Sequence, residues 1–113
     1  MIKMITSYLG KIIKKITKLS KREQEVLNKN DPNSSYYYCL MHSEIADVSA
    51  HEKIILTTTD CSLLYNSALS IHKLNKEKLF ERLLELNNVA YIKLFLMNVK
   101  FHKEKYEGLL LFL

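Results

Sequence analysis

The segment from His42 to Glu52 gathers the side chains best suited to proton transfer. It contains two histidines and three carboxylates within eleven residues. An imidazole beside a carboxylate can transfer protons near neutral pH, and Asp47 and His51 would be neighbours on a helix, four positions apart. A small metal-independent nuclease built on His42 and His51 is therefore one hypothesis. The same composition is typical of a polar loop or an exposed helix, which we favour.

Metal-ligand chemistry has less support. Cys39-x-x-His42 could form half of a zinc site, but Cys61 and His72, with ten residues between them, lack the spacing of the other half. Asp60 has no second carboxylate beside it and suits a helix N-cap better than a magnesium ligand. We therefore predict no catalytic residue, no metal and no cofactor, and two reduced cysteines that are partly buried.

Positive charge is concentrated at the N-terminus. Residues 1–22 contain seven basic residues and no acidic one, whereas the other 91 residues have a balance of −2. The seven are Lys3, Lys11, Lys14, Lys15, Lys18, Lys21 and Arg22. Such an asymmetry marks an interaction surface for a negatively charged partner. We predict that these residues bind an acidic or phosphate-bearing surface of a protein or ribonucleoprotein, or nucleic acid directly.

The same region has a helical period. Its apolar residues are spaced by three and four positions, which predicts a basic amphipathic helix over residues 2–19; they are Ile2, Ile5, Leu9, Ile12, Ile16 and Leu19. The stripe could pack on the protein's own core with solvated lysines, or pack there while the lysines bind a partner. It could also form a coiled coil in a homodimer. Binding to a lipid surface is disfavoured because the chain has no Trp.

Tyrosines suggest a second contact. Exposed aromatic rings beside basic residues suit single-stranded nucleic acid, because bases stack on them. Tyr36 and Tyr37 are therefore added to the predicted binding residues. On a strand, neighbouring side chains face opposite ways, so at most two of the three rings from Tyr36 to Tyr38 share a face.

The predicted elements give an α+β fold in a single domain, residues 1–113, with a small antiparallel sheet covered by helices. The helices are 2–19, then 21–29, which is either a short helix opened by a Ser20–Glu23 capping box or a continuation of the first, one capped by Asp60, and one capped by Asn75 that ends at Asn87. β-Forming composition predicts strands at 36–41, 53–59, 89–101 and 109–113, with a loop over 28–35. No internal repeat is evident. A small all-α bundle is the alternative.

The general character of the chain narrows its class. It has no apolar run long enough to span a membrane and no secretory signal, so we expect a cytoplasmic protein. Lysine greatly outnumbers arginine while glycine and proline are scarce, which indicates a low-GC genome. Small size, this bias, the basic helix and the lack of catalytic motifs resemble phage-encoded host-takeover inhibitors of the anti-CRISPR kind, in overall character rather than in a motif. The resemblance implies a non-enzymatic inhibitor of a nucleic-acid-handling complex such as a CRISPR effector. A direct RNA- or DNA-binding module is the alternative.

Overall fold

The computed structural model describes residues 20–102 and 104–111, and every regular element in these ranges is helical. The elements are the segment 20–29, α2 (Pro32–Met41), α3 (Val48–Ile55), α4 (Cys61–Ser70), α5 (Lys76–Leu86), α6 (Val89–Asn98) and a 3₁₀ helix, η1 (Glu104–Leu111). The predicted α+β fold is therefore wrong, and the all-α alternative gives the right class. The predicted helix 2–19 lies outside the described residues. Among the described helices none is both long and apolar enough to cross a bilayer.

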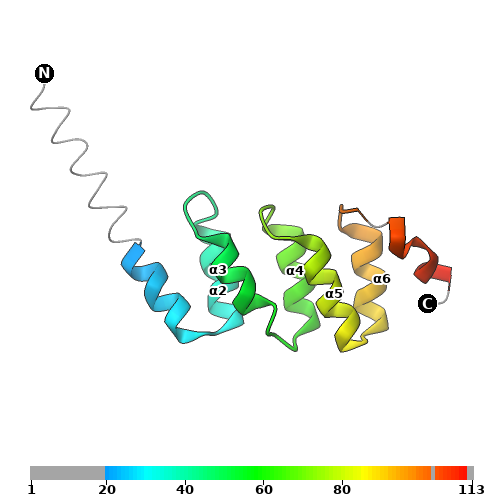
Figure 1. The fold of residues 1–113 in the computed structure, drawn as a ribbon, viewed down its shortest axis with the longest axis horizontal. Coiled ribbons are helices and arrows are strands. Elements are labelled where there is room, and N and C mark those ends of the chain that lie inside the picture. Colours follow the sequence, from blue (N-terminus) through cyan, green and yellow to red (C-terminus); the bar gives the residue numbers. More distant parts are fainter. Residues whose placement is uncertain (1–19, 103, 112–113) are drawn as a thin grey trace, which may run out of the picture.

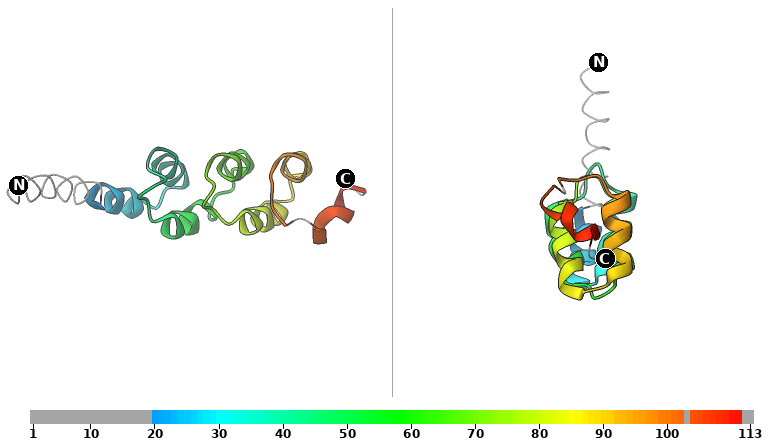
Figure 2. Two further views of the ribbon diagram at one scale, coloured as in Figure 1. Left: turned by 90° about the horizontal axis from the view of Figure 1, so that it is seen from above. Right: turned by 90° about the vertical axis from the view of Figure 1, so that its right-hand side faces the viewer.

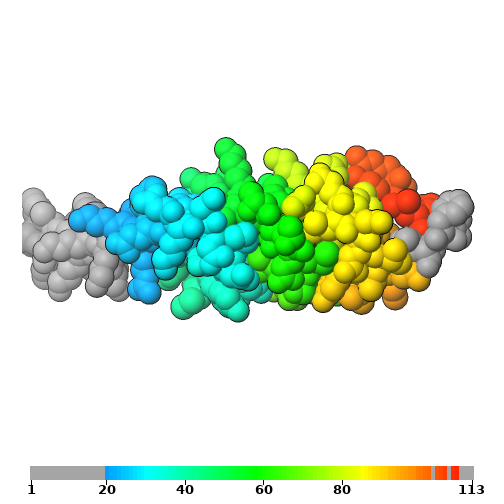
Figure 3. Space-filling view, turned by 90° about the horizontal axis from the view of Figure 1, so that it is seen from below, coloured from blue at the N-terminus to red at the C-terminus, as the bar shows by residue number. Residues whose placement is uncertain are grey.

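The helices stand side by side in a row and alternate between two layers (Figures 1 and 2). One layer contains α2, α4 and α6, which contact one another in that order. The other contains segment 20–29, α3, α5 and η1. Seen from below, the segments follow one another along the row in chain order (Figure 3). Successive helices are therefore antiparallel, and their connections lie at the two ends of the helices.

The row has an internal repeat of 28 or 29 residues, which the sequence analysis missed. The N-caps of α2, α4 and α6 are Asp31, Asp60 and Asn88, and those of α3 and α5 are Asp47 and Asn75. Three buried positions recur with the same offset, since residues 51, 52 and 55 of α3 correspond to the buried residues 79, 80 and 83 of α5, whereas buried Val48 corresponds to the half-buried Lys76. Each unit is thus a helix pair that buries its apolar face against the next pair, the logic of a solenoid.

Three predicted strands are wholly or partly helical in the structure. Residues 36–41 belong to α2, residues 53–55 end α3, and residues 89–98 form α6. In α6 and its C-cap the buried residues are Ile92, Phe95, Leu96 and Val99, a spacing of three, one and three positions. β-Propensity reflects packing in a sheet rather than a fixed backbone preference, so tertiary packing overrides it. The fourth predicted strand, 109–113, overlaps the end of η1, and its last two residues lie outside the described ranges.

Capping residues explain where the helices begin and end. Each N-cap side chain accepts a backbone N–H of the first turn, as Asp31 does from Ser34. Pro32 follows it at the first helical position, where its missing N–H costs nothing, so the predicted loop 28–35 is only a short turn. Asn30 and Asn87 end their helices in the left-handed region, with φ of 50° and 55°. The helices that the sequence predicted from the caps Asp60 and Asn75 are confirmed.

The core runs the length of the row and ends in an aromatic cluster. Phe80 of α5 is fully buried and its ring lies 5.2 Å from that of Phe95, 5.4 Å from Phe101 and 4.7 Å from Tyr106, centroid to centroid. These contacts join α5, α6 and η1. Aromatic pairs at such separations add to the stabilisation from burial, so η1 closes the C-terminal end of the core.

The Asp60 cap predicts a dependence of stability on pH. The pKa of Asp60 lies below its ordinary value of 3.8, chiefly because the Ser62 hydroxyl donates to the carboxylate, although partial burial opposes this. A lowered pKa contributes stability above pH 3.8 that is lost as the pH falls through the lowered value. We expect Asp60→Asn, which caps without titrating, to lose less stability in acid than the wild type. Asp60→Ala should lose about 1 kcal/mol at neutral pH. Thermal unfolding followed by circular dichroism would check this, and identical acid slopes for wild type and Asp60→Asn would contradict it.

Candidate functional site

The structure separates the predicted binding residues into three groups. Five lie outside the described residues: Lys3, Lys11, Lys14, Lys15 and Lys18. Lys21 and Arg22 are exposed on segment 20–29. Tyr36 and Tyr37 lie on α2 with their rings edge to face at 5.2 Å; Tyr37 is 59% exposed, whereas Tyr36 packs against the core.

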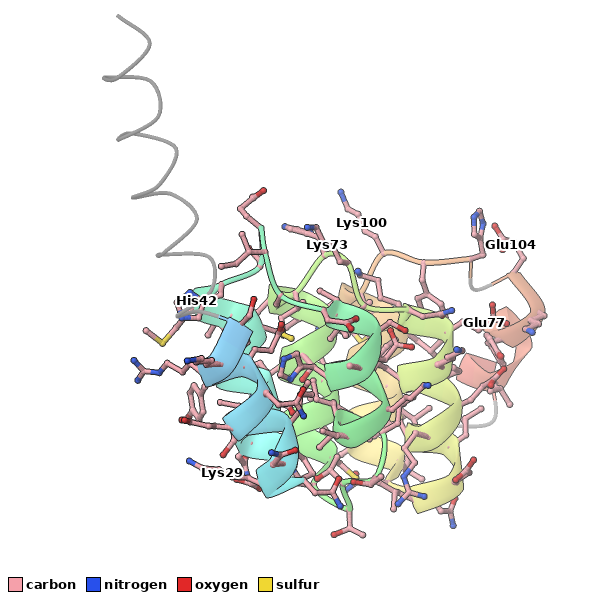
Figure 4. All side chains as sticks on the ribbon, turned by 60° about the vertical axis from the view of Figure 1, so that its left-hand side comes forward. Lys29, His42, Lys73, Glu77, Lys100 and Glu104 are labelled. Atoms are coloured by element: carbon pink, nitrogen blue, oxygen red, sulfur yellow. The ribbon has the colours of Figure 1, made fainter. Side chains whose placement is uncertain are left out.

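A groove between segment 20–29 and α2 brings Arg22 and Tyr37 together. We call it the basic groove; it is lined by Arg22, Val26, Lys29, Ser34, Tyr37, Tyr38, Met41 and His42. Lys29 and His42 lie at opposite ends of it (Figure 4). Lys21 joins Arg22, Lys29 and Glu25 in an adjoining hollow. The predicted residues Lys21, Arg22 and Tyr37 are therefore on one continuous surface.

The basic groove is positive and partly apolar. Its lining includes two basic side chains, Arg22 and Lys29, but no carboxylate. Neither cation is in an ion pair with another residue of the described ranges. Tyr37 and Met41 are both more than half exposed and supply apolar surface beside the charges. Cations next to an accessible ring are the combination that contacts both the phosphate and the base of a nucleotide.

A buried polar network holds segment 20–29 against α2 and α3. His51 of α3 is fully buried; its Nδ1 lies 3.0 Å from the Ser35 hydroxyl and its Nε2 lies 3.0 Å from Glu23 Oε2. Because a carboxylate only accepts, Nε2 donates to Glu23. The same carboxylate oxygen accepts the backbone N–H of Asp47 at 2.8 Å. Three helices therefore meet at one imidazole.

Tyr38 and Cys39 of α2 adjoin this network. The Tyr38 ring stacks on His51 with a centroid separation of 5.1 Å and also touches the ring of His42. Burial, reinforced by the nearby Glu23 carboxylate, raises the pKa of the Tyr38 hydroxyl. The same two causes raise the pKa of the Cys39 thiol to about 12. Tyr38 and Cys39 therefore stay protonated at neutral pH and add no charge to the network.

The network corrects three sequence-based interpretations. Ser20 already lies inside the helix and Glu23 bonds to His51, so the predicted capping box is wrong. Asp47 caps α3 and does not pair with His51. Glu52 accepts from the backbone N–H of Asn75 and pairs with Lys78. The polar cluster from His42 to Glu52 is thus divided among different partners, and it does not converge on one site.

Ser35, His51 and Glu23 have the composition of a hydrolytic triad but not its access. The Ser35 and His51 side chains are both fully buried, and Tyr38 covers one face of the imidazole. A nucleophile must reach a substrate carbonyl or phosphate, and here the hydroxyl faces only the protein. The arrangement positions helices; we find no geometry in it that supports the nuclease hypothesis.

Other groups of polar side chains in the described residues are weaker candidates for a functional site. No group of three or more potential ligands could hold a metal ion there, and Cys39 and Cys61 are free thiols. A second pair of hollows at the loop end is lined by Lys76 and Lys100, with His72 in one and His102 in the other. The ammonium of Lys76 donates to the backbone carbonyl of His72, and no exposed tyrosine or phenylalanine ring lines these hollows.

Lys29 and His42 were missed by the sequence analysis as groove residues, and Glu23 as the partner of His51. Lys29 lies outside the acid-free segment 1–22, and His42 was considered only as a catalytic group or a zinc ligand. No local signal joins Glu23 to His51, which is 28 positions away. A comparison of the chain with known protein families, curated proteins and solved structures finds no match.

Proposed function

We propose that this protein is a non-enzymatic module that binds single-stranded nucleic acid directly. The basic groove supplies the contact surface, and the lysines of residues 1–18 add positive charge along the same end of the chain. The single observation that carries the proposal is that Arg22, Lys29 and the exposed ring of Tyr37 line one groove without a carboxylate. Cys39 and Cys61 are free thiols, which suits a cytoplasmic location, and we include that location in the proposal.

Each groove residue has a distinct role. Arg22 and Lys29 contact phosphates, which supply most of the affinity and make it dependent on salt. Tyr37 stacks on a base; such contacts contribute about 1–3 kcal/mol per base and tolerate any sequence. His42 lies at the end of the groove and can donate or accept a hydrogen bond. Binding should therefore show little sequence preference.

Single strands are favoured over a duplex by the aromatic ring. A stacked base in a duplex has no free face for Tyr37, whereas an unpaired base has one. The cations alone would bind both forms. A preference for single-stranded over double-stranded oligonucleotides of equal length is therefore the signature of the groove.

The test measures fluorescence anisotropy of labelled single-stranded and double-stranded oligonucleotides over a range of salt concentrations. We expect wild-type protein to prefer the single strand. The triple variant Arg22→Gln, Lys29→Gln, Tyr37→Ala should weaken single-strand binding at least about 100-fold, because it removes two phosphate contacts and one stacked base. Tyr37→Ala alone should reduce the preference for single strands and leave the salt dependence unchanged.

The matched control removes two exposed lysines elsewhere, Lys53→Gln with Lys100→Gln, and should cost only a few-fold. Absence of binding to bare nucleic acid at low salt would contradict the proposal. It would leave the inhibitor hypothesis, in which the same cations face an acidic protein or a ribonucleoprotein. Turnover of the oligonucleotide would contradict the non-enzymatic reading.

A further inference from the structure

Segment 20–29 forms one wall of the basic groove with little apolar packing of its own. Arg22, Val26 and Lys29 line the groove from this segment, and the remaining lining residues belong to α2 and its C-cap. No side chain of residues 20–30 is buried, and Val26 and Leu27 are the only half-buried apolar ones. By contrast, α5 buries three large apolar side chains. Because hydrophobic stabilisation scales with the apolar area removed from water, apolar contacts alone would hold this wall weakly.

A polar contact at Glu23 joins the segment to α3. The Oε2 atom of Glu23 lies 3.0 Å from His51 Nε2 and accepts the backbone N–H of Asp47 at 2.8 Å. We call these two hydrogen bonds the polar latch. His51 is fully buried and Asp47 is the N-cap of α3, so α3 fixes both partners. Hydrogen bonds to a carboxylate are stronger than neutral ones, so the position of the weakly packed segment depends on the latch.

The connection from the segment to α2 fixes only one end of this wall. It turns at Asn30, whose φ is 50°, and α2 begins directly after its N-cap Asp31. Lys29 is next to this turn, whereas Arg22 is eight residues from Asn30, about 12 Å along a helix. A small rotation about the turn would therefore move Arg22 much farther than Lys29. The latch at Glu23, beside Arg22, holds that far end in place.

The latch adjoins the groove without lining it. None of its three residues belongs to the lining. Tyr38 connects the two, because its ring stacks on His51 with centroids 5.1 Å apart and also belongs to the lining. Tyr37, the next residue back along α2, supplies the exposed ring. The latch therefore sets the position of Arg22 relative to Tyr37 from outside the surface that faces a bound strand.

The same contact recurs in the next repeat. Glu52 follows Glu23 by 29 residues and accepts the backbone N–H of Asn75, the N-cap of α5, at 3.0 Å. Helix α3, which contains Glu52, also contributes Val48 and Ile55 to the hydrophobic core. Segment 20–29 contributes no residue to that core. Dependence on the carboxylate is therefore greatest in the first repeat, where the groove lies.

We infer that Glu23 is the positioning residue of the basic groove: the polar latch holds Arg22 opposite Tyr37, and the groove binds a strand only while the latch is closed. The inference rests on the proposed function. It also predicts the sign of an effect. Charge alone predicts tighter binding of a polyanion when Glu23 is removed. The latch predicts weaker binding, because the observed Kd is the intrinsic value divided by the fraction of protein in the competent state.

The binding test compares Glu23→Ala with Glu25→Ala by fluorescence anisotropy of a labelled single-stranded oligonucleotide at one salt concentration. Both variants remove one carboxylate from the same segment, but Glu25 is exposed and forms no ion pair within the described residues. We expect Glu25→Ala to bind a few-fold more tightly and Glu23→Ala at least about 10-fold more weakly, since two charge-assisted hydrogen bonds are lost. Glu23→Gln keeps an acceptor and should recover part of the affinity.

Amide hydrogen exchange measures the latch without a ligand. In Glu23→Ala the amides of residues 24–29 should exchange at least about 10-fold faster than in wild type, because a short helix that is no longer packed is marginal in water. Those of α4, α5 and α6 should keep wild-type rates, which shows that the variant is folded.

Unchanged or tighter binding by Glu23→Ala, or wild-type exchange at residues 24–29, would overturn the inference. If the wild-type chain binds no oligonucleotide, the proposed function fails, and the exchange rates alone decide whether Glu23 holds the groove together.

Discussion

Replacing His51 by alanine is expected to lower the free energy of unfolding by about 2–4 kcal/mol, because it leaves buried polar groups without their hydrogen-bond partner and opens a cavity where the ring was. The imidazole is fully buried, and its loss leaves the Ser35 hydroxyl and the Glu23 carboxylate without their shared partner. Domains of this size are stable by only about 5–15 kcal/mol, so the variant should unfold at much lower urea concentration. Denaturant titration followed by circular dichroism gives the measurement.

The matched control is His42→Ala, which removes an imidazole of the same size from a partly exposed position in the basic groove. We expect it to cost less than about 1 kcal/mol, as for most surface substitutions. Glu23→Gln keeps a hydrogen-bond acceptor opposite Nε2, so its loss of unfolding free energy should lie between those of His42→Ala and His51→Ala. If His51→Ala were no more destabilising than His42→Ala, the network would not be what holds segment 20–29 in place.

The second large effect is expected in binding. Changing Lys11, Lys14, Lys15 and Lys18 together to Gln should lower the affinity for a single-stranded oligonucleotide by about 100-fold or more at low salt, because each lost phosphate contact no longer releases a counterion. The slope of log K against log salt should become shallower by up to about 3, or about 0.7 for each contact. The melting temperature should stay within a few degrees, since solvated charges contribute little to folding.

A control with the same change in charge uses Lys53, Lys73, Lys78 and Lys100, which are exposed outside segment 20–29 and α2. This control variant should lose much less affinity for the oligonucleotide, and its slope of log K against log salt should stay close to that of the wild type. Equal losses in the two variants would mean that net charge alone drives binding and that the N-terminal segment has no special place in it. Unchanged binding in the first variant would remove residues 1–18 from the interface.

Several local features could be predicted from the sequence because neighbouring residues determine them. Asp60 and Asn75 were recognised as N-caps since a short polar side chain can bond the backbone two or three residues ahead. Helical spacing predicted a buried stripe of Leu79, Phe80, Leu83 and Leu84; the first three are buried, and Leu84 is half-buried against the core. The internal repeat could also have been found in the sequence, because Asp31, Asp60 and Asn88 recur at intervals of 29 and 28 residues. It was hard to detect because the other equivalent positions of the repeats share only an apolar or polar character.

The choice between strand and helix needed the tertiary structure. Residues 36–41 are an unbroken run of aromatic and apolar residues, and residues 89–98 are nearly so, and this composition alone favours the strand. A strand would need a partner edge for its backbone groups, whereas a capped helix satisfies most of them internally. Packing α2 against α3 and α6 against α5 buries the helical face, which decides the outcome.

The sequence by itself determined the concentration of positive charge in residues 1–22, the caps Asp60 and Asn75, and the absence of charge from the segments that became α2 and α4. Only the tertiary structure decided that Arg22, Lys29 and Tyr37 share a groove and that Glu23 bonds to His51. The physical reason is the distance along the chain over which each kind of interaction acts. Capping and periodicity act over one or two helical turns, whereas a groove or a buried polar contact depends on how separate helices pack, and many packings suit the same local pattern.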